Sequence, residues 1–166
     1  NSFCTLLAPY SSLTSHCQRG DPPRSRPTLL RMDIDFDAED IYDELCEVYD
    51  PERMPATLAD LKVVTMDGVK VERLRPRRYR VEVTLVPTVP HCHLMTLIAL
   101  SVRAKLLYSL PPTTHWAVTL RVPKGTHTDA EAIEKQVNDK ERVAAALENP
   151  ALLKEVKKLI REDVGD

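Results

Sequence analysis

Residues 79–110 read YRVEVTLVPTVPHCHLMTLIALSVRAKLLYSL, and this stretch decides the fold. Apolar and polar residues alternate over Tyr79–Val86, which predicts a strand with one buried face. Two prolines end the strand, and the apolar run after them predicts a helix from about His93 to Ser109. We expect Arg103 and Lys105 of this helix to face water, because charged side chains are rarely buried.

The neighbouring segments complete a small mixed sheet. Trp116–Val122 alternates again, so residues 79–122 are expected to form a strand–helix–strand crossover. Upstream, Leu61–Thr65 and Val69–Glu72 are β-like, and Arg73–Arg80 is expected to be a basic connection. Helical patterns precede these strands and also fill the C-terminal part of the chain. The predicted fold class is therefore α/β (α+β), a mixed sheet with helices packed on it and a helical C-terminus.

Composition sets the domain organisation and excludes several classes of function. Residues 1–32 are expected to be a disordered extension rich in Ser, Pro and Arg, and residues 33–166 a single domain. A formal net charge of −2 and 5% aromatic residues argue against nucleic acid or an anionic membrane as partner. The cysteines form no CxxC pair, which suits reduced thiols in a cytosolic protein. They are Cys4, Cys17, Cys46 and Cys92.

Cys92 stands in the turn at the start of the predicted helix, where free N–H groups and the helix dipole favour a thiolate. If the two long strands are parallel, the turn Gly125-Thr126-His127 shares this edge of the sheet. Thiolate and imidazole suit zinc or iron, so His91, Cys92 and His127 are candidate metal ligands. The alternatives are a cysteine that only fills the core and loop histidines that are only solvated.

Five separated motifs agree in order and spacing with one known family. They are Asp50-Pro51-Glu52, Thr88-Val89-Pro90-His91-Cys92, Thr96-Leu97-Ile98, Gly125-Thr126-His127 and the run from Asn138 to Asn149. On these motifs the chain resembles the eukaryotic component 2 family of cytosolic iron–sulfur protein assembly, whose bacterial relatives are SufT-like and PaaD-like proteins. The resemblance extends from about Phe36 to Glu162.

The resemblance implies a targeting or adaptor subunit rather than an enzyme. Its partners would be a WD-repeat β-propeller subunit, a HEAT-repeat adaptor and client iron–sulfur apoproteins in the cytoplasm and nucleus, some of them linked to chromosome segregation. The resemblance implies no membrane as a partner. It does imply a domain-swapped homodimer and bound zinc. The resemblance also implies that no cofactor is permanently bound and that an iron–sulfur cluster is held only transiently.

The resemblance assigns roles to individual residues as well. The reactive thiol for cluster transfer carries over onto Cys92. The motif and partner contacts carry over onto Asp50, Pro51, Glu52, Gly125, Thr126, His127 and Arg142. A thiol-based redox enzyme that uses Cys92 is the alternative function, and nucleic-acid binding through Arg73–Arg80 is the weakest.

Overall fold

The structure, a computed structural model, describes residues 36–162. Its elements in chain order are α1 (Ala38–Cys46), a 3-10 turn (Met66–Gly68), β1 (Val69–Arg75), β2 (Arg78–Thr84), α2 (Met95–Ser109), β3 (His115–Arg121), α3 (Ala130–Asn138), α4 (Lys140–Glu148) and α5 (Pro150–Ile160). The expected extension over residues 1–32 lies outside the described residues, as do Cys4 and Cys17. Within residues 36–162, no helix has both the length and the apolar character needed to cross a membrane.

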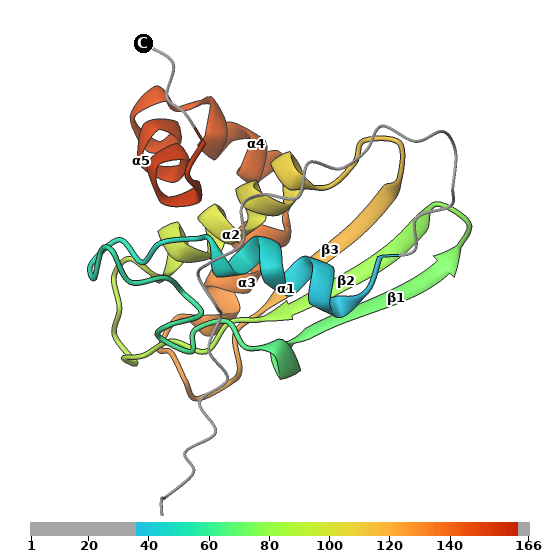
Figure 1. The fold of residues 1–166 in the computed structure, drawn as a ribbon. Helices are drawn as coiled ribbons and strands as arrows, with labels where there is room; N and C mark the ends of the chain where they lie inside the picture. The colour runs from blue at the N-terminus through green and yellow to red at the C-terminus, as the bar shows by residue number, and fades with distance from the viewer. Residues whose placement is uncertain (1–35, 163–166) are drawn as a thin grey trace, which may run out of the picture. The chain divides into compact units, whose positions relative to one another are not determined.

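The three strands form a mixed sheet in the order β1-β2-β3 (Figure 1). Strand β2 pairs with β1 antiparallel and with β3 parallel, so that Val81 lies between Val71 and Val118. Tyr79, Val81 and Val83 are buried and alternate with more exposed residues, because one face of β2 meets the core. The predicted strand–helix–strand crossover and the predicted mixed fold class are both confirmed.

The helices gather on one side of the sheet (Figure 1). At the centre, α2 contacts α1, α3, α5 and β3, and all its residues from Ile98 to Leu106 are buried. The prediction that Arg103 and Lys105 face water is therefore wrong, since only 7% and 6% of their surfaces are exposed. Lys105 is accommodated because its Nζ lies 2.9 Å from a carboxylate oxygen of Glu47 on the α1 side.

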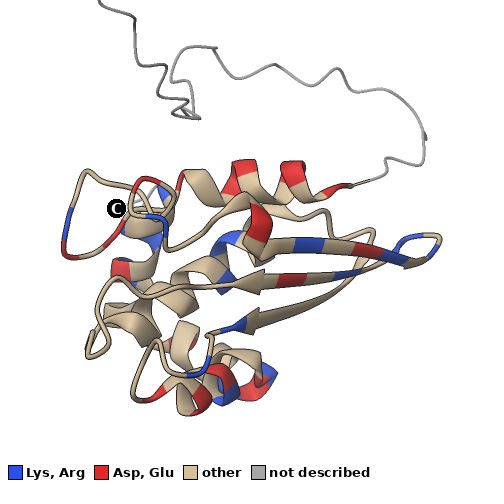
Figure 2. Ribbon diagram, turned by 90° about the horizontal axis from the view of Figure 1, so that it is seen from below, with Lys and Arg blue, Asp and Glu red and all other residues tan. Residues whose placement is uncertain are grey.

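Two other expectations about the upstream strands are corrected. Leu61–Thr65 is a turn, in which the N–H groups of Val63 and Val64 both donate to the carbonyl of Leu58. Both valine side chains are buried, so this apolar run serves the core without pairing as a strand. Most of Arg73–Arg80 lies in a β-hairpin instead of a loose connection, because β1 continues to Arg75 and β2 begins at Arg78. Figure 2 marks in blue the Lys and Arg positions of this hairpin and in red the acidic positions of α1 along the ribbon.

The outer edge of β3 is covered by polar side chains of α3. The Asn138 amide accepts from the N–H of Leu120 at 2.9 Å and donates to its carbonyl at 2.8 Å. Just after the end of the strand, a Glu134 carboxylate oxygen accepts from the N–H of Val122 at 2.6 Å. These bonds satisfy backbone groups that an edge strand would otherwise leave open. They also fix α3 against the end of β3 that leads to the candidate site.

Candidate functional site

Two turns meet where the parallel strands β2 and β3 end (Figure 1). One turn leads from β2 to α2 and carries Cys92, and the other leads from β3 to α3. The N–H of Leu85 donates to the carbonyl of Arg121 at 2.8 Å, and the N–H of Thr128 donates to that of Pro90 at 3.1 Å. The prediction that both turns share one edge of the sheet is therefore confirmed.

The His127 imidazole fastens one turn to the other. The N–H of Asp129 donates to its Nδ1 at 3.0 Å, so Nδ1 carries no proton. The proton is then on Nε2, which lies 3.1 Å from the carbonyl oxygen of Cys92 and donates to it. Because the ring is buried and both nitrogens are bonded, His127 holds the Cys92 backbone in place.

The rest of the Gly125-Thr126-His127 motif shapes its own turn. The Oγ1 of Thr126 donates to the carbonyl of Pro123 at 2.7 Å, and its N–H reaches the same carbonyl at 3.2 Å. Gly125 has a φ of 85°, a conformation that glycine adopts without the steric cost that a side chain would bring. The motif thus produces the turn that presents His127 to Cys92.

Cys92 is half-buried, forms no disulfide and lines a pocket of about 160 Å³. The pocket is also lined by His91, His93, Thr96, His127, Thr128, Asp129 and Ile133. The helix begins later than the sequence predicted, since α2 starts at Met95 and the carbonyl of Cys92 accepts the Met95 N–H at 3.2 Å. Cys92 therefore sits in the turn ahead of the helix, beside a polar pocket.

The structure brings the three candidate metal ligands to one pocket without arranging them around a metal. No group of three His, Cys, Asp or Glu residues within the described part of the chain could hold a metal ion. His127 already uses both ring nitrogens, and ligation would cost it one of its two bonds. Zinc binding by His91, Cys92 and His127 stays a prediction.

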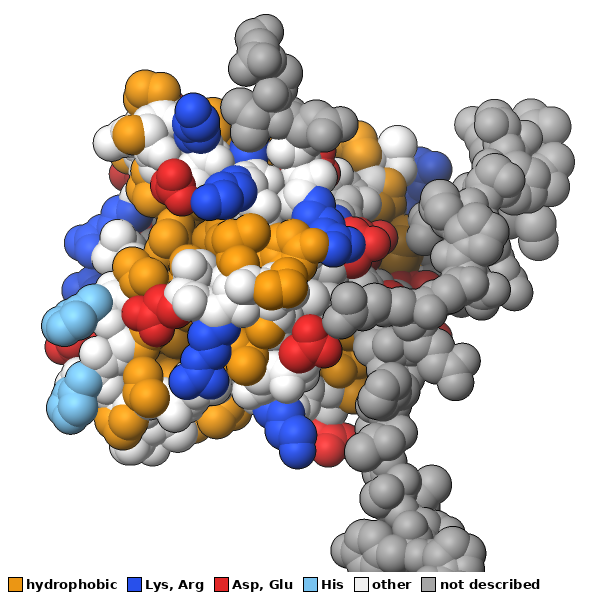
Figure 3. All heavy atoms as spheres, turned by 60° about the vertical axis from the view of Figure 1, so that its left-hand side comes forward, with side chains coloured by type: hydrophobic (Ala, Val, Ile, Leu, Met, Phe, Trp, Pro, Cys, Tyr) orange, Lys and Arg blue, Asp and Glu red, His pale blue; other side chains and the backbone are white. Residues whose placement is uncertain are grey.

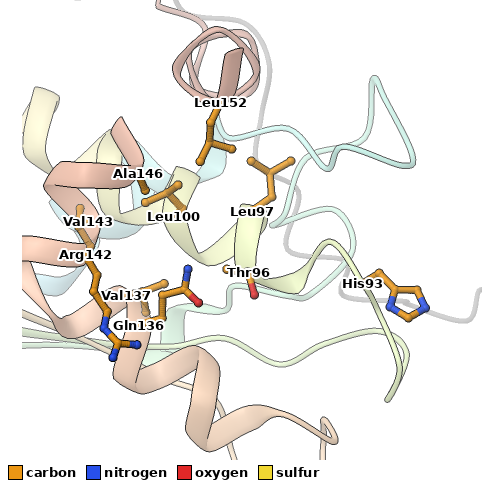
Figure 4. Close-up of a pocket in the computed structure, with 10 residues that line it drawn as sticks. All are labelled: His93, Thr96, Leu97, Leu100, Gln136, Val137, Arg142, Val143, Ala146 and Leu152. Carbon is orange, nitrogen blue, oxygen red and sulfur yellow. The ribbon is translucent and has the colours of Figure 1, made fainter. Parts of the chain in front are cut away.

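A second pocket, of about 230 Å³, adjoins the first and shares His93 and Thr96 with it. Figure 4 shows apolar side chains of α2, α4 and α5 converging on it, with Gln136 and Arg142 nearby. Arg142 thus lies by this apolar pocket, and its Nε is 3.5 Å from an Asp139 carboxylate oxygen. Hydrophobic side chains also spread over the face of the molecule seen in Figure 3, where two histidines stand at the edge.

The Asp50-Pro51-Glu52 motif lines neither of these pockets. One carboxylate oxygen of the buried Asp50 accepts from the N–H groups of Glu52 and Arg53, both at 2.9 Å. The N–H of Asp50 donates in turn to the carbonyl of Ala56 at 3.0 Å. Asp50 therefore folds the loop that follows α1, in the way that Asx turns do. Partner contacts through this motif stay a prediction.

The sequence did not reveal Thr128 and Asp129 as residues of the site, nor Glu134 and Asn138 as the residues that dock α3. Asn138 had a usable signal, since an Asn within a helical pattern can satisfy backbone groups elsewhere. The sequence did not show that Asn138 would cover the edge of β3. The site is thus wider than the predicted residues, and its outer parts depend on tertiary contacts.

Comparison with known proteins gives a consistent result. Residues 38–120 match the family model described as iron-sulfur cluster assembly protein. Protein AE7 of Arabidopsis thaliana is 48% identical over 121 residues, which cover 73% of each chain. The MIP18 family protein galla-2 of Drosophila melanogaster is 44% identical, over 75% of this chain and 76% of its own. Cytosolic iron-sulfur assembly component 2B of Mus musculus is 44% identical, over 73% and 71%.

Proposed function

Because the chain belongs to the iron–sulfur cluster assembly protein family, whose relatives here include MIP18 family proteins, we propose that it acts in cytosolic iron–sulfur assembly. Within that process it is a targeting or adaptor subunit that helps to deliver clusters to cytosolic and nuclear apoproteins. The name of the mouse relative, a cytosolic assembly component, supports the compartment and the process. The cluster is the cargo, and the partners are a WD-repeat β-propeller subunit, a HEAT-repeat adaptor and the client apoproteins.

The observation that carries this proposal is the half-buried Cys92 on a fastened turn beside a polar pocket. Its backbone is held by His127, so the position of the thiol is set before any cargo arrives. A stable cluster site needs a full set of thiolates, whereas one thiolate can touch a cluster and release it. The arrangement therefore suits a brief contact during transfer better than storage.

Capture from cytosol tests the adaptor role directly. The full chain and its Cys92→Ser variant are each tagged, expressed in place of the natural copy and recovered with whatever they bind. We expect both chains to recover a β-propeller subunit and a HEAT-repeat adaptor in equal amounts, because the thiol acts in transfer and not in assembly. Recovery of neither partner by the wild-type chain would show that it is no adaptor in this machinery.

The thiol-based redox enzyme is the alternative proposal for the same residue. It requires Cys92 to be oxidised by a peroxide or a disulfide and then reduced again by a second thiol. The other cysteine among the described residues, Cys46, lies on α1 and does not line the Cys92 pocket. Turnover of hydrogen peroxide or of a small disulfide by the full chain, lost in Cys92→Ser, would favour the enzyme over the adaptor.

A further inference from the structure

A third cavity lies at the opposite end of α2 from the Cys92 turn. It is a groove of about 780 Å³ between the C-terminal half of α2, the start of β3 and one face of α4. Most of its lining is apolar, and Leu107 and Tyr108 at its side remain 55% and 50% exposed. Arg103 is the groove residue nearest the start of α2 and comes eight residues after Met95, so roughly 12 Å of helix separates the groove from the Cys92 turn.

Arg103 is the unusual member of this groove. Its guanidinium is buried, and one of its terminal nitrogens donates to the carbonyl of Val118 at 2.5 Å. Its Nε has no acceptor, and it is the one buried side-chain nitrogen or oxygen of residues 36–162 in that condition. Burial also lowers the pKa of Arg103, with no acidic neighbour to offset the effect.

Lys105, two residues away on the same helix, is a buried cation whose charge is compensated by acidic side chains. Its ammonium group has the carboxylates of Glu47 and Glu44 at 2.9 and 3.6 Å. Arg103 has the same burial without such a partner, and an unpaired buried donor destabilises a fold. The charge of Arg103 is therefore not neutralised by any acidic side chain of the described residues, and the carboxylate of a ligand in the groove can neutralise it.

The charge of the groove also favours a ligand that carries a carboxylate. Its lining contains the cations Arg103 and Lys140 together with His115, and it contains no Asp or Glu. A ligand with a carboxylate therefore meets only complementary charge, and a basic ligand meets repulsion. The apolar lining, with Trp116 and exposed Leu107 and Tyr108, favours aliphatic or aromatic side chains in the same ligand.

We propose that this groove binds a segment of another protein that places apolar side chains between α2 and α4 and presents an Asp or Glu carboxylate to the guanidinium group of Arg103. The groove thereby gives the chain a docking surface separate from the Cys92 turn. Binding in the groove does not depend on the Cys92 thiol. A test of this surface therefore gives a result that is independent of the proposed cluster transfer.

Selection from a library of random short peptides tests the proposal with the full chain as bait. The recovered peptides are expected to combine aromatic or aliphatic residues with at least one Asp or Glu. One of them is then synthesised with both ends blocked, together with a counterpart in which the acid is replaced by its amide. We expect the amide peptide to bind about tenfold or more weakly, measured by fluorescence anisotropy.

Variants of the protein locate the binding surface. Arg103→Met keeps an apolar filler of similar length and should weaken the acidic peptide to the level of its amide counterpart. Leu107→Glu changes an exposed residue, so folding is preserved while the added charge repels the ligand. Leu74→Glu on β1 is the matched control, since Leu74 is also exposed and lies outside the groove, and Cys92→Ser should bind normally.

Three outcomes overturn the proposal. The first is the absence of any enriched peptide, or enrichment of peptides without acids. The second is equal binding of the acidic and amide peptides, or binding that Leu107→Glu leaves unchanged. The third is sedimentation of the full chain as a dimer that Leu107→Glu converts to a monomer, because the groove would then be an interface between two copies of this chain.

Discussion

Replacement of His127 tests whether this ring fastens the Cys92 turn. His127→Phe keeps an aromatic ring of similar size and removes both hydrogen bonds, those to the Cys92 carbonyl and from the Asp129 N–H. Each bond contributes about 1 kcal/mol, so we expect the free energy of unfolding to fall by about 2 kcal/mol. For a domain of this size, that loss lowers the melting temperature by roughly 6–10 °C.

Two other replacements of His127 should each remove one of its two hydrogen bonds and keep the other. His127→Asn leaves an acceptor close to the position of Nδ1, so it should keep the Asp129 contact and lose the one to Cys92. His127→Gln reaches towards the Cys92 carbonyl instead and should lose the Asp129 contact. Each variant is expected to lose about 1 kcal/mol, half the effect of the phenylalanine.

Urea unfolding of the full chain and amide hydrogen exchange provide the readouts. The amide of Asp129 should exchange faster in the Phe and Gln variants and stay protected in the Asn variant, because only Asn retains its acceptor. If His127→Phe unfolds within about 0.5 kcal/mol of the wild type, or if Asp129 exchange is unchanged, the ring does not hold the two turns together.

Two further predictions concern the surroundings of the site. Asn138→Ala leaves both backbone groups of the buried Leu120 without partners, so urea unfolding should show a loss of about 2–4 kcal/mol, and a loss below about 1 kcal/mol would contradict the role of Asn138 at the strand edge. The hydrogen bond and the charge of Lys124 lower the pKa of Glu131. Any stabilisation from this pair is thus present above the ordinary pKa of Glu and is lost as the pH falls through the lowered value. An NMR titration should show the Glu131 midpoint rise in Lys124→Met, and an unchanged midpoint would disprove the pairing.

The strands and their arrangement could be predicted where a residue pattern has one physical cause. In β2, alternation follows from a sheet with one buried face, and both the strand and its parallel partner β3 were found. At Leu61–Thr65 the same kind of apolar run has another cause, because Val63 and Val64 are buried from within a turn. Pattern alone does not distinguish these two cases.

The partners of the buried polar side chains could not be predicted from the sequence. Arg103 and Lys105 looked like the solvated face of α2, yet their partners lie on β3 and beside α1, at Val118 and Glu47. The turn of His127 was correctly placed next to Cys92, because parallel strands end at the same edge. That both ring nitrogens would bond to backbone groups depends on tertiary geometry, and the sequence carries no sign of it.

Delivery of clusters to client proteins through the Cys92 thiol is the core of the proposed function. Its most direct test is the radioactive iron recovered with an immunopurified client from cells in which the full chain replaces the natural copy. Cys46→Ser serves as the matched control, because Cys46 is the other half-buried cysteine of the described residues.

We predict that Cys92→Ser folds normally by circular dichroism, recovers the same partners and lowers the iron content of the client severalfold, while Cys46→Ser leaves it unchanged. Client iron at the wild-type level in Cys92→Ser would contradict the claim.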